Sequence, residues 1–399
     1  MAKSAARRVT CALALLTLAS CSTSAPVTLG GPPDAPPLAC TGDAFQAFTP
    51  PADPGERGLL LTVSGEALAT GGYDFSPGAS RAADPAFVDG WAVTFDHVLV
   101  SFDEVTLSDA PDGDPNDQSR TGAVLARVKG PWAYDLAKPT AAARTGKSGA
   151  PEKADPFAAF RDLDPEKKYA LGFETVPAKN CAMAMNLDDS AKALWREMVA
   201  RGYVVYYEGT AKYRGDSSCT QNGGHDFSKL PEEVHFRLGF ASPSAYVNCQ
   251  NPDQQGPADN AFEEAPRGVQ VKANAGSTAQ LTFHTDHPFW DKLTHDAPLH
   301  FDPIAAAAVG PDGGVAEVST DSLARLDYNG FRTADGAPLP PRSCAADYTP
   351  IRSEQLRFDP SGVGPLLSYL DFATYSQSTQ GHLNADGLCA VKRRYKSPR

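Results

Sequence analysis

The feature that most constrains the fold of this chain is a series of short apolar segments separated by glycine, proline and aspartate. The clearest spans residues 91–107, where apolar side chains alternate with other residues on both sides of a break at Asp96-His97. Alternation with period two places these side chains on one face of an extended strand, and that face is buried. The segment predicts two strands, or one long bent strand, half buried in a β-sandwich.

The rest of the chain follows the same pattern. The 34 glycines and 34 prolines supply turns between further predicted strands at residues 58–69, 123–128, 168–175, 203–213, 234–240, 268–273 and 279–284. Helices are predicted at residues 190–201, capped by Gly202, at 155–163, which opens with Asp155-Pro156, and at 320–326. We expect a mainly β, β-sandwich-like fold with a few short helices and long loops. It would occupy residues 40–391 as one region or as two subdomains.

Residues 281–308 hold half of the eight histidines, interleaved with aspartates. If the strand at 280–284 continues to Asp286, then His284 and Asp286 share one face, and Pro288 ends the strand. Neutral imidazole and carboxylate together suit zinc, copper, iron or nickel. The candidate metal ligands of this segment are His284, Asp286, His287, His295 and His300, and the candidate ions are zinc and copper.

A second interpretation of this segment needs no metal. His287, Phe289 and Trp290 would form a packed polar and aromatic loop, and Asp296 and Asp302 would start turns before prolines. A third interpretation is that the protein is a metallohydrolase in which Asp286 or Asp296 acts as the general base. The chain contains neither a Gly-x-Ser-x-Gly elbow nor a His-Glu-x-x-His helix, so an enzyme is the less favoured class.

The amino terminus indicates export. Lys3, Arg7 and Arg8 precede an apolar run at residues 9–19, which is too short to span a bilayer and is typical of a secretory signal. The run ends in Leu18-Ala19-Ser20-Cys21, which resembles the lipobox of bacterial lipoproteins. The resemblance implies cleavage after residue 20, acylation of Cys21 and a lipid bilayer as partner. Because Ser22 rather than aspartate follows, it also implies the outer membrane, on its periplasmic face or at the cell surface.

Residues 22–39 are small, polar and rich in proline, which predicts an extended tether between the lipidated cysteine and the folded region. The formal net charge is −12, and loss of the signal would make the chain more acidic. An acidic body argues against nucleic acid as a partner. The last eight residues, 392–399, form a basic tail that we expect to be frayed, with lipid headgroups as an alternative contact.

Cysteine usage agrees with an oxidising compartment. Once Cys11 and Cys21 are set aside, six cysteines remain, and an even number predicts three disulfides. Sequence alone allows 15 pairings of six cysteines; we expect Cys219 with Cys249 and Cys40 with Cys389. The remaining two candidates are Cys181 and Cys344. The absence of Cys-x-x-Cys spacing argues against thiolate metal ligands.

The segments HTDHPFWDKLTHDAPLHFDPIAA and SYLDFATYSQSTQGHLNADGLC resemble uncharacterised envelope lipoproteins of myxobacterial type. No activity is implied by this resemblance. It does suggest His382, in the second segment, as a partner of the histidines in the first. The leading hypothesis is therefore an exported, lipid-anchored protein that binds a divalent transition metal for a structural, storage or hand-over role. The alternative is a metal-free module that binds an envelope protein or a glycan.

Overall fold

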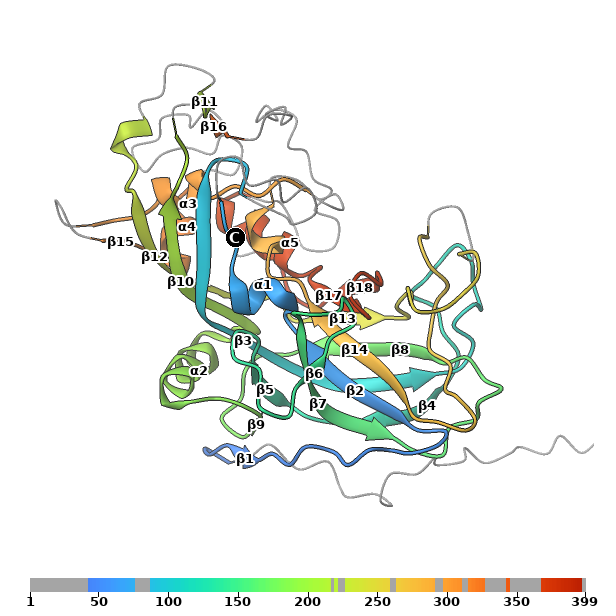
Figure 1. Ribbon diagram of the computed structural model, residues 1–399. Helices are drawn as coiled ribbons and strands as arrows, with labels where there is room; N and C mark the ends of the chain where they lie inside the picture. Colours follow the sequence, from blue (N-terminus) through green and yellow to red (C-terminus); the bar gives the residue numbers. More distant parts are fainter. Residues whose placement is uncertain are drawn as a thin grey trace, which may run out of the picture.

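The computed structural model describes residues 42–75, 87–216, 219–221, 227–258, 263–290, 297–310, 315–326, 342–344 and 367–396. Two sheets dominate this part of the chain, so the expected mainly β, sandwich-like fold is confirmed (Figure 1). The larger sheet has the strand order β1 (Gln46–Ala47), β9 (Met183–Ala184), β5 (Trp132–Asp135), β3 (Trp91–Ser108), β10 (Val205–Tyr213), β12 (Glu233–Phe240) and β15 (Ala316–Ser319), with β4 (Val124–Val128), β8 (Ala170–Thr175), β13 (Ser244–Val247) and β18 (Ala390–Arg393) attached to it.

The smaller sheet has the order β17 (Gly381–Leu383), β14 (Ser277–Phe283), β2 (Leu59–Ser64), β7 (Lys153–Phe160) and β6 (Arg144–Thr145). A separate pair joins β11 (Thr220–Gln221) to β16 (Arg342–Ser343). The helices are α1 (Glu66–Gly71), α2 (Asp189–Arg201), α3 (Asp302–Ala306), α4 (Thr320–Leu323) and α5 (Tyr369–Gln377), with short 3₁₀ turns η1 (Phe227–Lys229) and η2 (His287–Phe289).

Strand β3 organises both halves of the molecule. It is one continuous 18-residue strand, and its pairing with β10 shifts register at Glu208/Gly209, opposite the predicted break at Asp96-His97. The alternative of a single bent strand is therefore correct, because a bulge bends the strand without ending it. Its first half is covered by the segment that carries η2 and α3, and its second half packs against the smaller sheet (Figure 1).

Aromatic side chains fill the space between the two sheets. Phe102 of β3 contacts Phe157 of β7 at 5.1 Å and Phe283 of β14 at 5.9 Å between ring centroids. Trp132 and Phe173 extend this layer from the larger sheet. Each ring removes about 150–250 Å² of surface from water, so this layer fixes how the sheets face each other.

Several local predictions are wrong. Residues 155–163 are not helical: Asp155-Pro156 lies within β7, where the Asp155 carboxylate accepts a hydrogen bond from the Tyr134 hydroxyl at 2.6 Å instead of capping a helix. Residues 268–273 form no strand and make a single isolated bridge, from Val269 to Tyr169. The segment 58–69 is strand only as far as Ser64, after which α1 begins. In each case tertiary contacts override the local preference.

Helix α2 confirms the prediction at 190–201, with small shifts at its start. Asp188, rather than Ser190 or Asp189, is the N-cap, and its carboxylate accepts from the Ala191 amide. Gly202 closes the helix in the left-handed conformation, with φ of 68°. The predicted helix at 320–326 is confirmed in its first part as α4.

His97 ties α2 to the larger sheet. Its Nδ1 donates to the buried carboxylate of Asp135 at 2.6 Å, and its Nε2 lies 3.0 Å from the Ser190 hydroxyl. Ser190 in turn lies 2.6 Å from the Asp188 carboxylate, so its proton belongs to the helix cap. The hydrogen bond to Asp135 raises the pKa of His97 above its ordinary value of 6.5, although burial opposes the rise.

This contact should make the stability of the fold depend on pH. Because the folded pKa of His97 exceeds the unfolded value, its contribution is fully present below about pH 6.5 and is lost as pH rises through the folded pKa. We expect His97→Gln to lower the free energy of unfolding more at about pH 6 than at about pH 9. Urea titrations of both proteins at the two pH values measure the difference, and an equal loss at both would contradict the prediction.

Two disulfides join described cysteines, and both predicted pairings are wrong. Cys219 pairs with Cys344, and Cys249 pairs with Cys389. Cys181 is disulfide-bonded as well, whereas Cys40 lies outside the described residues. The expected pairing of Cys219 with Cys249 assumed that cysteines flanking neighbouring strands must meet. Cys249 instead follows β13, whose antiparallel partner β18 begins directly after Cys389.

The basic tail is not frayed over its first residues. Lys392 and Arg393 belong to β18, and the Arg394 guanidinium donates two hydrogen bonds of 2.6 Å to the Glu174 carboxylate. Arg393 lies over the Tyr375 ring at 3.9 Å. The folded region therefore includes residues that were predicted to be tail. Among the described residues, no helix is both long enough and apolar enough to cross a membrane.

Candidate metal centre

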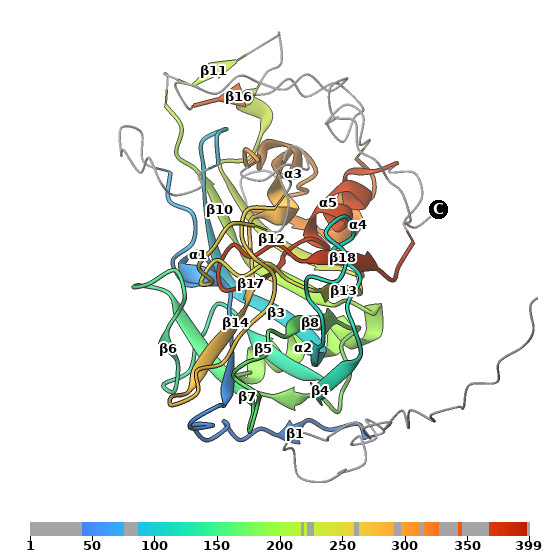
Figure 2. The same cartoon turned by 90° about the vertical axis from the view of Figure 1, so that its right-hand side faces the viewer.

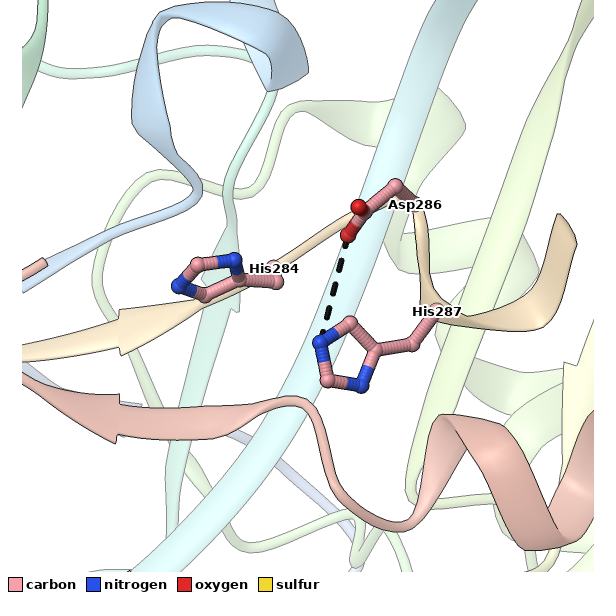
Figure 3. A group of neighbouring side chains, drawn as sticks. All are labelled: His284, Asp286 and His287. Carbon is pink, nitrogen blue, oxygen red and sulfur yellow. Dashed lines mark ion pairs between the residues drawn. The ribbon is translucent and has the colours of Figure 1, made fainter. Parts of the chain in front are cut away.

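The predicted ligands His284, Asp286 and His287 follow the end of β14. The strand stops at Phe283, and Asp286 has helical dihedrals of −85° and −25°, so the extended conformation does not continue to Asp286 as expected. Instead η2 begins at His287, with Pro288 in its first turn. The turn folds the chain back and brings the ligand atoms of His284, Asp286 and His287 close together. Figure 3 shows the Asp286 carboxylate and the His287 imidazole facing each other, with His284 beside them.

Phe289 anchors this turn in the core. Its ring is fully buried against the rings of Phe87, Phe95, Tyr207, Phe236 and Phe301. On the other side of the turn, the Ser376 hydroxyl at the end of α5 donates to the His287 carbonyl at 2.6 Å. The turn that carries the ligands is therefore held by packing on one side and by a hydrogen bond on the other.

A third imidazole reaches the same place from the carboxyl end of the chain. β17 lies beside β14 and pairs with it antiparallel (Figure 2). In this pairing His382 is opposite Thr282. Gly381 makes this possible, because a Cβ at that position would stand 2.7 Å from the Tyr246 ring. The His382 ring centroid lies 4.1 Å from that of His284 and 5.5 Å from that of His287. The suggested partnership of His382 with the first segment thus has a structural basis.

The ligand atoms of His284, Asp286 and His287 lie within 4.8 Å of one another. With metal bonds of about 2.0–2.2 Å, two ligands of one ion stand at most about 4 Å apart. The three side chains therefore need only small rotations to close on one ion. The group has the size of a site for one ion, and the His382 ring packs against that of His284 beside it.

Hydrogen bonds set the tautomer of His287, which is 1% exposed. The Thr379 hydroxyl donates to the Ser376 carbonyl at 2.7 Å, so it can only accept from His287 Nδ1, which lies 2.7 Å away. With the proton on Nδ1, the lone pair of Nε2 points toward Asp286 Oδ1 at 4.0 Å. Metal-bound histidines are oriented in the same way, by a hydrogen bond from their other ring nitrogen.

His284 is oriented by the turn after β17. Its Nε2 donates to the Ala385 carbonyl at 3.1 Å, which leaves Nδ1 facing Glu66 Oε2 at 3.6 Å. Ala385 and its neighbour Asn384 both have positive φ, of 67° and 50°, which costs an alanine conformational energy. The surrounding hydrogen bonds hold this turn, including one from the Ala385 amide to Thr282 at 3.1 Å.

The charges around His284 belong to acidic side chains. Burial lowers the pKa of His284, but the carboxylates of Glu66 and Asp286 outweigh it and raise the pKa overall. Burial raises the pKa of Glu66 to about 7, with Asp286 adding to the rise and His284 opposing it. A divalent cation would replace the proton that this group of carboxylates and imidazoles holds.

Trp290 closes the site on the side of η2. Its indole lies 3.8 Å from the His287 ring centroid, and its Nε1 donates to Asp286 Oδ2 at 3.1 Å. No hydrogen-bond donor among the described residues reaches the buried Asp286 Oδ1. Buried acceptors normally have a hydrogen-bond partner. An oxygen without one is suited to bind a metal ion.

The structure does not bring all the predicted ligands together. His300 lies apart from this group, with Nδ1 3.4 Å from the buried carboxylate of Asp89. Its neighbour Leu299 bridges to both Phe87 and Trp290, and with the backbone held in this way the His300 side chain faces Asp89. Asp89 also accepts from the amides of Phe301 and Asp302 at 2.8 Å, so His300 serves a different polar cluster. His295 and Asp296 lie outside the described residues.

Sequence reasoning missed two acidic residues of the site, Glu66 and Asp386. Glu66 opens α1 directly after β2, and its carboxylate forms a second potential ligand group with His284 and Asp386. Nothing local marks Glu66, since its place beside His284 follows from the parallel pairing of β2 with β14. Asp386 lies four residues after His382, and this closeness in sequence was the one available signal.

No protein-family model matches this chain, and no curated protein or solved structure is significantly similar to it. The comparisons therefore assign no family. The likeness to myxobacterial envelope lipoproteins stays a prediction, and the function has to be argued from the site.

Proposed function

We propose that this protein binds one divalent transition metal ion through His284, His287, His382 and the carboxylate of Asp286. The observation that carries the proposal is the group of His284, Asp286 and His287, whose ligand atoms lie within 4.8 Å of one another, with the ring of His382 on the paired strand β17 packed beside it. Two of these imidazoles are already oriented by hydrogen bonds from their other ring nitrogen. In each of these two rings, the hydrogen bond leaves the second nitrogen as the one that would bind the ion.

The donor set narrows the class of ion. Nitrogen and oxygen ligands suit Zn²⁺, Cu²⁺, Ni²⁺ and Fe²⁺, whereas Cu⁺ prefers thiolate and thioether. We propose zinc or copper as the first ions to test. The side chains of His284 and Asp286 are 12% and 15% exposed, so solvent reaches one side of the site. This exposure favours an exchangeable ion, and hence storage or hand-over, over a closed structural site.

Elemental analysis of the untagged protein, purified from the periplasm or outer membrane of its producing cell, tests the proposal directly. We expect about one equivalent of a transition metal, retained through dialysis and removed by a chelator. If no metal binds, even after reconstitution with Zn²⁺ and Cu²⁺, the site is a polar core. The protein would then be better explained as a metal-free binding module for an envelope protein or glycan.

Thr379→Val should weaken metal binding without removing a ligand. The substitution takes away the acceptor that holds His287 in its metal-binding tautomer, and loss of such a partner costs about 10–100-fold in affinity. Thr374→Val, at a buried position in α5 shortly before the half-buried Thr379, is the control, since no side-chain hydrogen bond joins Thr374 to a ligand histidine among the described residues. Competition with a chromogenic chelator measures both, and equal affinities would argue against the proposed role of Thr379.

We also propose that the protein is exported and anchored to a lipid bilayer through Cys21. Support comes from the basic start, the apolar run at residues 9–19 and the lipobox-like Leu18-Ala19-Ser20-Cys21. The disulfides agree with an oxidising compartment. Metabolic labelling with an alkyne fatty acid should mark the wild type and not Cys21→Ser. Labelling of both proteins, or of neither, would contradict a lipid anchor at Cys21.

A further inference from the structure

The ligand groups at this site form two overlapping sets. The inner set is His284, Asp286 and His287, and the outer set is Glu66, His284 and Asp386. In each set the ligand atoms lie within 4.8 Å of one another. His284 belongs to both, so an ion bound in either set contacts the same imidazole.

The two sets differ in their access to solvent. Asp386 of the outer set is exposed, and the Glu66 side chain is 16% exposed. In the inner set His287 is 1% exposed, and His382 beside it is 3% exposed. Glu66, His284 and Asp286 are each 12–16% exposed, so Asp386 is the most accessible of these ligands and the imidazoles of His287 and His382 lie deepest.

The sets also differ in their donors. Two carboxylates and one imidazole offer mostly oxygen, which binds divalent cations with modest preference among them. Adding His287 and His382 makes the inner position rich in imidazole, which favours zinc, copper and nickel. A transition metal ion is thus bound more tightly at the inner position, where more of the ligands are imidazoles. This difference in affinity favours transfer of the ion from the outer to the inner position.

Charge around the outer set would speed the capture of a cation. Beside Glu66, the carboxylate of Asp386 is exposed and that of Asp286 is 15% exposed, which places negative charge on the solvent side of the site. A cleft lined with one sign of charge raises the local concentration of the opposite ion and its on-rate by about 10–10³-fold.

We propose that Glu66 and Asp386, together with His284, form an outer position that captures a divalent cation and passes it to the inner position. This inference rests on the proposed metal-binding function. Because His284 is shared, the ion can exchange the two carboxylates for His287, Asp286 and His382 without returning fully to solvent. The step exchanges ligands and involves no redox change.

Stopped-flow mixing with Co²⁺, followed by its visible absorption, separates capture from final affinity. We expect the double variant Glu66→Gln/Asp386→Asn to bind Co²⁺ at least about tenfold more slowly, with a weaker dependence on salt. Its equilibrium affinity should change far less than its on-rate. The control Glu104→Gln/Asp112→Asn, which removes the same two charges elsewhere on the surface, should bind at the wild-type rate.

Three results would overturn the proposal. An unchanged on-rate in the double variant would exclude a capture role. A loss of affinity that arises in the off-rate would make Glu66 an ordinary ligand of the inner ion. Failure of the wild type to bind Co²⁺, Zn²⁺ or Cu²⁺ would instead overturn the metal-binding function itself. Asp386→Asn alone changes an exposed side chain, so it gives a smaller slowing with no risk to folding.

Discussion

His287→Gln is expected to abolish stoichiometric metal binding. The substitution removes the most buried of the proposed ligands, and its loss should cost more than the about 10–100-fold that follows from loss of an outer-shell partner. The variant should also lose the stability that the bound ion gives. A free ion concentration of 100 times the dissociation constant stabilises the folded state by about 2.7 kcal/mol. Thermal unfolding with and without chelator measures this: the chelator should lower the melting temperature of the wild type and leave the variant unchanged.

His235→Gln is the matched control for this experiment. His235 lies on β12, is half-buried, and belongs to neither ligand group of the described residues. It should keep the metal and the response to chelator. His300→Gln makes a second comparison, since we expect it to keep the metal while losing the contact with Asp89. Full metal content in His287→Gln would contradict the proposed site.

Replacement of Cys249 and Cys389 by alanine is expected to destabilise the protein and also weaken metal binding. The disulfide joins residues separated by 140 positions, and loss of a native disulfide costs about 2–5 kcal/mol. Cys389 closes the segment that carries His382 and the Ala385 carbonyl that orients His284. The hydrogen bond from Asn384 to Asn251, at 2.8 Å, would remain as a weaker tie.

The Cys219–Cys344 disulfide provides the comparison. It joins residues separated by 125 positions, so its removal should cost a similar amount of stability by the same argument. It lies beside Gly90, next to β3, and not beside the segment that carries His382. Urea unfolding and chelator competition on both double variants should show two unstable proteins, of which only the Cys249/Cys389 variant has lost affinity. An equal loss of affinity in both would make the effect one of global stability.

Local pattern was a reliable guide where a segment interacts mainly with itself or with one face of a sheet. The alternation in 91–107 predicted β3 and its irregularity at Asp96-His97, because burial of one face requires period two. The capping residues predicted α2 and the left-handed Gly202. Asp155-Pro156 was misleading, because the same residues suit a helix start and a strand whose carboxylate accepts from Tyr134.

The candidate metal site likewise contains residues that the sequence predicted and residues that only the structure places there. His284, Asp286 and His287 are close in sequence, so their density predicted a site even though the expected extended geometry was wrong. His300 shared that density and yet faces Asp89, since backbone pairing of its neighbours decides the direction of its side chain. Glu66 had no signal at all, since only the pairing of β2 with β14 places it beside His284.

By itself, the sequence determined the class of fold, the main strands and one helix, and the segment where the candidate metal ligands gather. These depend on hydrophobic periodicity and capping, which act between residues a few positions apart. Only the tertiary structure decided which cysteines pair, which histidines meet and which acids join them. Those contacts link residues separated by about a hundred positions or more, and they follow from strand pairing and aromatic packing that no local pattern encodes.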